Sequence, residues 1–271
     1  MITDKFFICA GSVTGASHKQ AGRNNQDAYF IASDSEDLVA VVCDGCSSSL
    51  KSEVGANLMA RFIATEALRL MKMNRVFASD ILLELEQNTL AYLRGITDAF
   101  PDKGKAIDEM FLATVMGVVV NRFSTTIFSA GDGVFSLNGK INIIDEENAP
   151  TYLGYKINPG GYIVDEEKIK FIVREEVATD DVKNIQIATD GAKELEEKAG
   201  NSLFLLGKEE RVGGLDQFET EGRYLKNPTL LQKRLFQINA DKVSVDWEKQ
   251  EVRRSKGLLT DDTTIVMIRR K

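Results

Sequence analysis

The sequence predicts an α+β fold in which antiparallel sheets carry helices on their outer sides. Nine apolar runs rich in Val, Ile, Phe and Thr have the length and composition of β-strands. Two long amphipathic segments follow one another after the third run, whereas a parallel βαβ sheet would alternate helices with strands. No Pro/Gly/Ser-rich linker divides the sequence, so we expect one domain over residues 1–271.

The predicted strands lie on both sides of the two amphipathic segments. They cover residues 5–13, 27–33 and 38–44 before them, and 111–120, 125–132, 133–139, 168–175, 184–190 and 261–269 after them. The glycines of Gly131-Asp132-Gly133 predict a hairpin between the fifth and sixth runs. Asn138-Gly139, a strong two-residue turn signal, predicts a second hairpin into residues 140–145.

Two helices are predicted from apolar residues at helical spacing. They cover residues 52–72 and 78–96, and the short connection between them favours an antiparallel pair. A third helical region is expected around residues 200–238, where the apolar pattern is broken. Helices are therefore expected at two places in the chain, with most of the strands between them.

Charge and cysteine content exclude several classes of protein. The net charge of -7 disfavours a nucleic-acid binder, which would present a basic face. Cys43 and Cys46 form a C-x-x-C pair, which could indicate redox chemistry or half a metal site, but there is no second cysteine pair. With His18 as the single histidine, a closed zinc site would need Asp or Glu to complete it. We therefore favour Cys43 as a core residue of a strand and Cys46 as a loop residue.

The location of the protein is predicted from what the sequence lacks. The N-terminal residues have neither the basic start nor the apolar core of a signal peptide. No uninterrupted apolar run approaches the roughly 20 residues that span a bilayer. With reduced cysteines, these features favour the cytoplasm and no membrane partner.

Aspartates recur at the ends of the predicted strands. They are Asp27, Asp44, Asp132, Asp190 and Asp261, with Asp262 beside the last. A single aspartate at the end of a strand is common in turns, and Asp44-Gly45 by itself is typical of a turn. If these strand ends converge, the carboxylates would repel one another unless a cation neutralised them. Oxygen ligands suit Mg²⁺ or Mn²⁺, and two such ions about 3.5–4 Å apart can activate water against a phosphate.

Six segments resemble the motifs of the PP2C family of metal-dependent protein serine/threonine phosphatases, in the family's order. They are SHKQAGRNNQDAYF, VVCDGCSSS, FLATVMGVVV, SAGDGVFSLNGK, IATDGAKELEE and TDDTTIVMIRR. The Ser-His-x-x-x-Gly-x-x-x-Gln-Asp pattern resembles a divergent, mainly bacterial branch. The resemblance implies a four-layer α-β-β-α sandwich with two central antiparallel sheets flanked by helices.

The resemblance also implies metal ligands and a mechanism. Asp44 would bridge two Mn²⁺ or Mg²⁺ ions, and Gly45 would offer its carbonyl. The remaining ligands would be Asp190 and Asp261 on the same ion, Asp27 from the other side, and Asp132 on a third, weaker ion. A metal-activated water would attack phosphorus without a covalent intermediate.

Three further residues are candidates for binding the substrate. The family's phosphate-binding arginine would fall at Gly22, so Arg23, one residue later, is the candidate here, with a solvated loop arginine as the alternative. His18 belongs to the Ser-His pattern of the first segment, and it either reaches the active site or caps its own loop. Thr114 occupies the family's threonine position. Residues 146–167, with three tyrosines, would form a flap over the cleft.

These observations support three functions. The first is an active Mn²⁺- or Mg²⁺-dependent phosphatase acting on phosphoproteins, the products of serine/threonine kinases. Asp27, Asp44 and Arg23 would then be its catalytic residues. The second is a catalytically weak relative that serves as a regulatory binding module. The third, a metal-dependent nuclease, uses the same carboxylates but lacks a basic stripe in its sequence.

Overall fold

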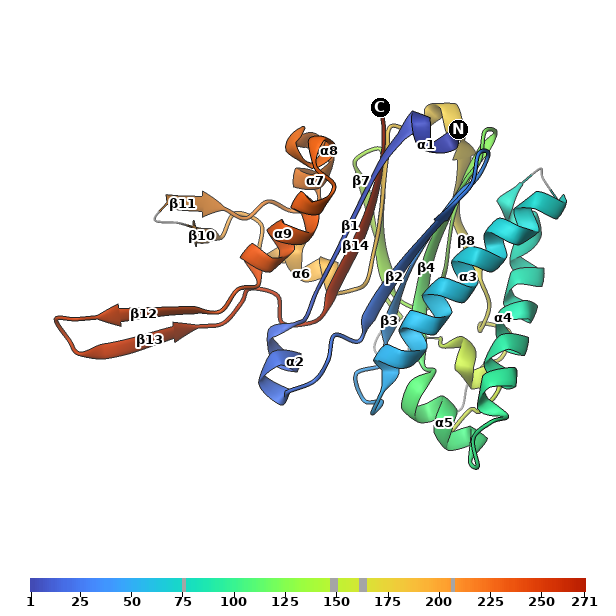
Figure 1. Cartoon of the computed structure of the whole chain (residues 1–271), viewed down its shortest axis with the longest axis horizontal. Coiled ribbons are helices and arrows are strands. Elements are labelled where there is room, and N and C mark those ends of the chain that lie inside the picture. The colour runs from blue at the N-terminus through green and yellow to red at the C-terminus, as the bar shows by residue number, and fades with distance from the viewer. Residues whose placement is uncertain (75–76, 147–150, 161–164, 206–207) are drawn as a thin grey trace.

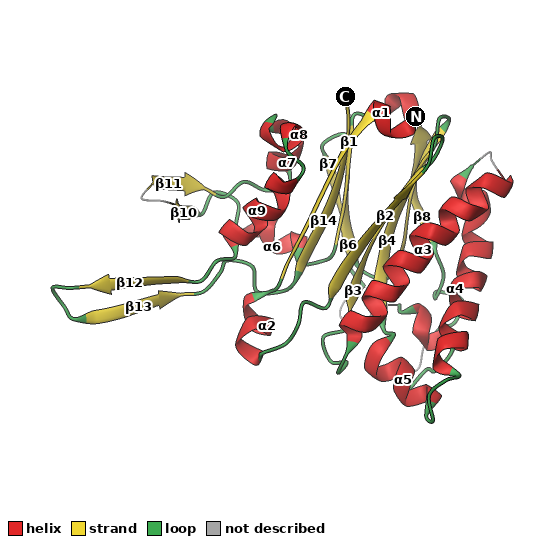
Figure 2. Cartoon of the chain, in the orientation of Figure 1, coloured by secondary structure: helices red, strands yellow, loops and turns green. Residues whose placement is uncertain are grey.

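The computed structural model describes residues 1–74, 77–146, 151–160, 165–205 and 208–271. Two antiparallel sheets lie against each other in the middle of the molecule (Figure 1), and helices cover the outer face of each (Figure 2). The predicted α-β-β-α arrangement is therefore confirmed. Both chain ends lie at one end of this sandwich, and helices α2 and α5 lie at the other (Figure 1).

Each central sheet has five strands, and every neighbouring pair is antiparallel. The first sheet has the order β1 (Phe6–Val13), β14 (Thr263–Arg270), β9 (Asn184–Ala188), β6 (Gly133–Leu137) and β7 (Lys140–Ile144). The second has the order β2 (Asp27–Ser33), β3 (Leu38–Gly45), β4 (Ala113–Val120), β5 (Ser124–Ala130) and β8 (Ile172–Ala178).

The apolar runs of the second sheet are continuous because both of its faces are buried. Along β3, Leu38, Ala40 and Val42 pack toward the first sheet, and Val39, Val41 and Cys43 pack toward the helices. All eight residues of β4 are buried in the same way. Successive side chains of a strand point to opposite faces, so a strand between two apolar layers needs apolar residues at every position.

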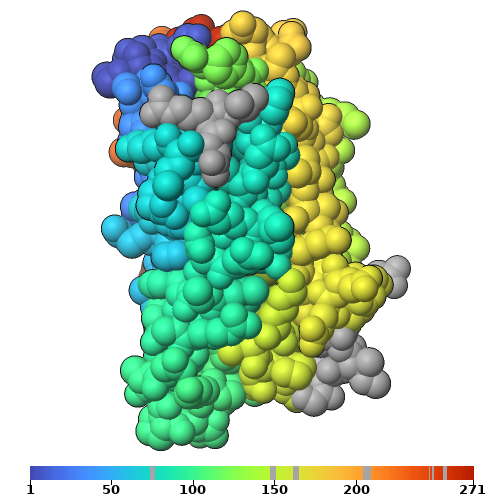
Figure 3. Space-filling model, turned by 90° about the vertical axis from the view of Figure 1, so that its right-hand side faces the viewer, coloured from blue at the N-terminus to red at the C-terminus, as the bar shows by residue number. Residues whose placement is uncertain are grey.

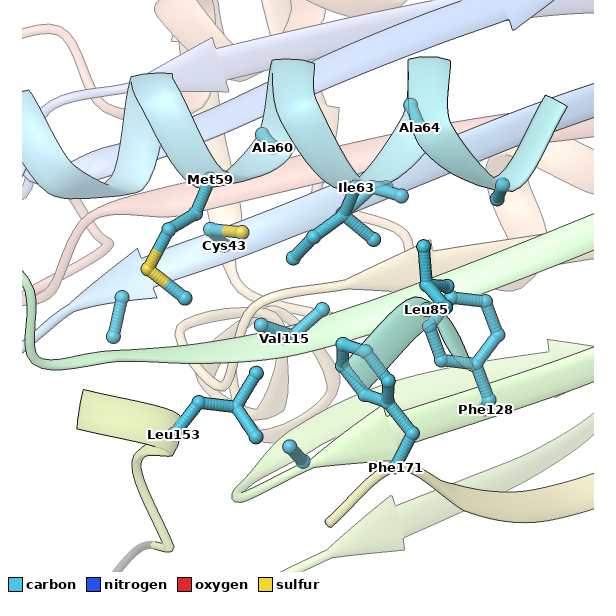
Figure 4. Packing of buried hydrophobic residues seen from close by; sticks show 14 of the residues in the cluster. Cys43, Met59, Ala60, Ile63, Ala64, Leu85, Val115, Phe128, Leu153 and Phe171 are labelled. Atoms are coloured by element: carbon cyan, nitrogen blue, oxygen red, sulfur yellow. The ribbon is translucent and has the colours of Figure 1, made fainter. Parts of the chain in front are cut away.

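The outer face of the second sheet is covered by an antiparallel helix pair, as predicted. These helices are α3 (Ser52–Asn74) and α4 (Leu82–Thr97), with η1 (Ala78–Ile81) before α4 and α5 (Lys103–Met110) after it. Figure 4 shows Met59 and Ile63 of α3 above Cys43 and Val115 of the sheet. Figure 3 shows the outer side of the pair, with the yellow segment that ends in β8 running beside it.

The first sheet carries shorter helices and two separate hairpins. The helices are α6 (Ala192–Glu197), α7 (Asp216–Thr220), α8 (Arg223–Lys226) and α9 (Thr229–Ile238). The hairpins are β10 (Ser202–Leu205) with β11 (Lys208–Arg211), and β12 (Lys242–Asp246) with β13 (Glu251–Ser255). The predicted helical region at 200–238 is thus partly helical, and the β12–β13 ribbon was not predicted. Short elements complete the fold: α1 (Ile2–Lys5), α2 (Ala16–Ala21), η2 (Leu153–Lys156) and η3 (Thr179–Asp181).

The hairpin predicted at Gly131-Asp132-Gly133 is wrong. The strand before it, β5, pairs with β4 and β8, whereas β6 after it pairs with β7 and β9 in the other sheet. Gly131 has a φ of 80°, and a Cβ there would lie 2.9 Å from Thr114 Cγ2. Glycine therefore lets the chain pass close to β4 as it crosses between the sheets.

The hairpin predicted at Asn138-Gly139 is confirmed. It joins β6 to β7, and the φ angles of the two residues are 53° and 87°. Both φ values are positive, as required in a two-residue turn whose twist matches that of the flanking strands.

The strand predicted at 168–175 is displaced toward the C-terminus, because β8 covers Ile172–Ala178. Of the helices that the structure describes, none has both the length and the apolar character needed to cross a bilayer.

Candidate metal centre

Strand ends from both sheets bring the predicted aspartates to one end of the sandwich. Asp27 begins β2 and lies opposite Asp44, near the end of β3. Asp44 also lies opposite Thr114 of β4. Asp132 lies in the crossover between β5 and β6, Asp190 follows β9, and Asp261 lies in the loop before β14. Residues up to 234 positions apart in the chain thus meet because antiparallel strands end together.

A cavity of about 350 Å³ lies at this end of the sandwich. Its described lining residues are Asp44, Gly45, Cys46, Ser47, Ser48, Thr114, Asp132, Tyr152, Asp190 and Asp261. Six of these were predicted from the sequence as ligands or substrate contacts. The described lining contains four carboxylates and neither lysine, arginine nor histidine, so a negatively charged group could enter it only with a cation.

Asp44 is the most strongly perturbed of the carboxyls in the cavity. One side of Asp44 reaches the cavity, and protein surrounds the rest. Removal of water by that surrounding protein is the main reason why its pKa lies well above the usual range. The negative charges of Asp27 and Asp190 raise the pKa further, followed by that of Asp261. Without a cation, the cavity therefore disfavours ionised carboxylates.

Asp27 lies behind Asp44, is 5% exposed and does not line the cavity. Its Oδ2 accepts a hydrogen bond of 2.7 Å from the Thr189 hydroxyl. Its Oδ1 is buried and has no hydrogen-bond partner among the described residues, and the same holds for Asp190 Oδ1. Buried carboxylate oxygens are normally paired. Two unpaired ones beside a crowded acidic cavity fit a set of ligands for divalent cations.

Asp132 and Asp261 also line the cavity. The backbone N–H of Glu146 donates a 2.7 Å hydrogen bond to Asp132 Oδ1, which ties the start of the expected flap to the crossover. Burial raises the pKa of Asp132, with Glu146 contributing like charge. The pKa of Asp261 is also raised, first by the protein around its carboxyl and then by the charge of Asp190.

Arg23 lies outside the described lining of the cavity. Its side chain is exposed, and its guanidinium donates a hydrogen bond to the carbonyl of Ser47. Ser47 itself lines the cavity, so Arg23 contacts the loop that forms the wall. The sequence alone could not show this, because the direction of a loop arginine depends on a segment 24 residues away.

His18 also lies outside the cavity lining, on α2. It is 8% exposed, and its Nδ1 lies 2.8 Å from Asp262 Oδ2, without hydrogen-bond alignment. Asp262 is buried and accepts hydrogen bonds from the backbone N–H groups of Gly15, at 2.6 Å, and Gln26, at 2.5 Å. Asp262 is therefore a buried hydrogen-bond acceptor.

Cys46, Ser48 and Tyr152 of the expected flap also line the cavity. Cys46 Sγ lies 3.1 Å from Ser48 Oγ. Burial alone would raise the pKa of the Cys46 thiol, but hydrogen bonds from Ser48 and Tyr152 outweigh this effect and lower the pKa. Tyr152 belongs to the expected flap and packs against Tyr155, with ring centroids 5.3 Å apart. The third flap tyrosine, Tyr162, lies outside the described residues.

Comparisons with known proteins identify the family. The profile of the family described as Protein phosphatase 2C matches residues 14–217, three quarters of the chain, and the chain belongs to this family. A search of curated proteins finds no match. The cavity at the strand ends lies within the matched range, except for Asp261.

Solved structures support the same fold. A bacterial serine phosphatase bearing an arginine-to-glutamate substitution is 12% identical, with 98% of each chain covered and a TM-score of 0.56. PppA from Pseudomonas aeruginosa, described as a key regulatory component of T6SS, is 14% identical, with 98% of each chain covered and a TM-score of 0.50. At this identity the likeness concerns the arrangement of the two sheets and their helices.

Proposed function

We propose that this chain is a metal-dependent protein phosphatase that hydrolyses phosphoserine and phosphothreonine in protein substrates. The observation that carries the proposal is the meeting of Asp44, Asp190 and Asp261 in one cavity, with Asp27 directly behind. Membership of the Protein phosphatase 2C family supports phosphate-ester hydrolysis as the reaction. The inter-sheet core joins both halves of the chain, so we expect residues 1–271 to act as one catalytic unit.

The residues fit two divalent cations, Mn²⁺ or Mg²⁺, because the donor set consists of oxygens. Asp44 would bridge them, with Gly45, Asp190 and Asp261 as further ligands. Asp27 would support the same centre from behind, and Asp132 would help to hold a third ion. The bound ions would lower the pKa of a water molecule and neutralise charge on the phosphate.

The chain's own residues would admit and orient the phosphate group. The described cavity lining has no cationic side chain, so the ions must supply the attraction for a phosphate dianion. Thr114, Ser47 and Ser48 offer hydroxyl groups on the cavity wall. Arg23 would act through the Ser47 loop, whose carbonyl it contacts. A peptide segment would then present its phosphorylated side chain to the cavity.

The proposal is tested by hydrolysis of a phosphothreonine peptide by the purified full chain. Turnover should require Mn²⁺ or Mg²⁺, stop with EDTA and be lost in Asp44→Asn. Circular dichroism of the variant should match the wild type, since the substitution conserves shape. Metal-independent turnover, or an active Asp44→Asn, would contradict the proposed centre.

A second candidate is a weakly catalytic binding module. The observation that favours it is the position of Arg23, which contacts Ser47 and lies outside the described cavity lining. This module would bind Mn²⁺ in calorimetry yet fail to turn over either the phosphopeptide or p-nitrophenyl phosphate. Metal binding with turnover would reject the module and support the phosphatase.

A further inference from the structure

A histidine and two aspartates form a cluster at the side of the cavity, and one of them, Asp261, also lines the cavity. The side chains of His18, Asp261 and Asp262 each offer a donor atom, and these atoms lie within 4.8 Å of one another. Metal–ligand bonds of about 2.1 Å place two donors of one ion at most about 4.2 Å apart. Small side-chain rotations would therefore bring all three donors onto one ion.

The histidine in this cluster has an unsatisfied nitrogen. His18 Nδ1 is buried and lacks a hydrogen-bond partner in the described part of the chain, although Asp262 Oδ2 lies only 2.8 Å away. An imidazole nitrogen and a carboxylate oxygen at this distance would ordinarily share a proton, whereas two ligands of one tetrahedral ion with bonds of about 2.1 Å lie about 3.4 Å apart. The alignment that a hydrogen bond would require is absent, so the nitrogen stays available to an ion if the two atoms move apart by about 0.6 Å.

The backbone around the cluster holds the ligands in place. The N–H groups of Ala16 and Ser17, at the start of α2, donate hydrogen bonds to the carbonyls of Leu259 and Thr260, at 2.9 and 3.0 Å. A Cβ at Gly15 would lie 2.4 Å from the carbonyl carbon of Asp261, so only glycine allows this approach. The helix with His18 is therefore fixed against the loop with both aspartates.

Asp262 is also positioned before any ion binds. Its two oxygens each accept a backbone hydrogen bond, from Gly15 and from Gln26. A carboxylate oxygen has two lone-pair directions, so Oδ2 retains one for a further contact. Such hydrogen bonds to a ligating carboxylate are the usual support for a metal site.

We propose that His18, Asp261 and Asp262 form an additional site for a divalent transition metal, with Zn²⁺ as the closest match. Imidazole and carboxylate together suit Zn²⁺ or Cu²⁺, whereas Mg²⁺ prefers oxygen alone. Asp261 also lines the cavity, so this site and the proposed catalytic centre share one carboxylate. The inference goes beyond phosphate hydrolysis and makes Zn²⁺ a competitor for Asp261.

The test uses Cu²⁺ as the probe, because its electron paramagnetic resonance spectrum reports coupling to imidazole nitrogen. The chain has one histidine, so every such signal in tag-free full-length protein belongs to His18. We expect imidazole coupling in the wild type, a changed pattern after ¹⁵N-histidine labelling, and loss of the signal when Zn²⁺ is added. His18→Phe should lose the signal and bind one Zn²⁺ fewer per chain in equilibrium dialysis.

Asp44→Asn is the matched variant, since it alters the cavity and leaves all three ligands of the new site. It should keep the imidazole coupling and lose phosphopeptide turnover. A wild-type spectrum without imidazole coupling would overturn the new site whether or not His18→Phe folds, and would leave the phosphatase proposal standing. Imidazole coupling in a wild type that has no turnover would support the site and contradict the phosphatase.

Discussion

Asp27 and Asp44 lie directly opposite each other on the neighbouring antiparallel strands β2 and β3, at the end where β3 meets the cavity. Like charges placed opposite each other destabilise a sheet. The pKa of each carboxyl is raised well above its usual range, first by burial and then by neighbouring negative charge. Two facing carboxylates of this kind lower the stability of the metal-free chain. The proposed cations would neutralise them and restore that stability.

Removing the charge of Asp44 is therefore expected to separate activity from stability. Asp44→Asn should lower turnover of a phosphothreonine peptide at least about 100-fold, because a bridging ligand is lost. It should also raise the Tm of the metal-free protein by a few degrees, because one of the facing charges is gone. Steady-state kinetics and scanning calorimetry in EDTA measure the two effects.

Asp180→Asn is the control for this prediction. Asp180 has a side chain that is 84% exposed and lies in η3, which contributes no residue to the cavity. Its loss of charge should change neither turnover nor Tm appreciably. A metal-free Asp44→Asn protein that melts below the wild type would count against repulsion at this pair.

The stability of the metal-free protein should fall as pH rises from about 4 toward neutrality. Asp27, Asp44 and Asp261 have raised pKa values in the folded state, so the folded chain holds more protons than the unfolded chain in this range. Stability then decreases with pH by up to about 1.4 kcal/mol per pH unit for each proton. Urea unfolding with EDTA at pH 5.0, 6.0 and 7.5 measures the slope.

Saturating Mn²⁺ should reverse this dependence, because the cation binds the ionised carboxylates and stabilises the folded state at higher pH. Asp44→Asn should show a shallower slope in EDTA than the wild type. A metal-free wild type that becomes more stable between pH 5.0 and 7.5 would show that these carboxyls ionise readily, contrary to the expected repulsion.

Much of the fold could be predicted because its signals are local. The continuous apolar run of β3 and the helical spacing of α3 each follow from a few neighbouring residues, and both elements occur where expected. The aspartates could be recognised as a group because each stands at the end of such a run. Their meeting in one cavity follows from strand ends that share an edge.

The parts that the sequence did not predict depend on distant segments. The residues Gly131-Asp132-Gly133 have hairpin composition, and only the partners of β5 and β6 show that the chain changes sheets there. The contact between His18 and Asp262 joins positions 244 residues apart. Such placements are decided by packing and have no signature within one window of sequence.

Gly45 should be intolerant of a side chain. A Cβ at this position would lie 2.7 Å from the Ser52 Cβ and 2.8 Å from the carbonyl oxygen of Gln26. Gly45→Ala would push the start of α3 and the Gln26 backbone away from the strand end that carries Asp44. We expect a loss of about 1–3 kcal/mol in the free energy of unfolding and a fall in kcat.

Gly95→Ala is the matched control for this substitution. Gly95 lies in α4, is exposed, and has open space where a Cβ would stand. Alanine there should stabilise the helix by roughly 0.5–1 kcal/mol and leave turnover unchanged. Urea unfolding and phosphopeptide kinetics on both variants make the comparison. Equal free energies of unfolding for Gly45→Ala and Gly95→Ala would show that the strand end at Gly45 accommodates a Cβ without loss of stability.

Arg23 should affect catalysis through the loop that it contacts. Its guanidinium binds the Ser47 carbonyl, and Ser47 and Ser48 line the cavity. Arg23→Ala should therefore lower kcat/KM by about tenfold, since a wall of the cavity becomes less ordered. Loss of a side chain that binds the phosphate directly would lower kcat/KM by about 100- to 1,000-fold.

Arg23→Lys is the control for this prediction. Lysine can still donate a hydrogen bond to one carbonyl, so it should restore most of the activity if Arg23 acts through the loop contact. A loss of 100-fold or more in Arg23→Ala that Arg23→Lys fails to restore would instead assign Arg23 to the two-pronged binding of phosphate.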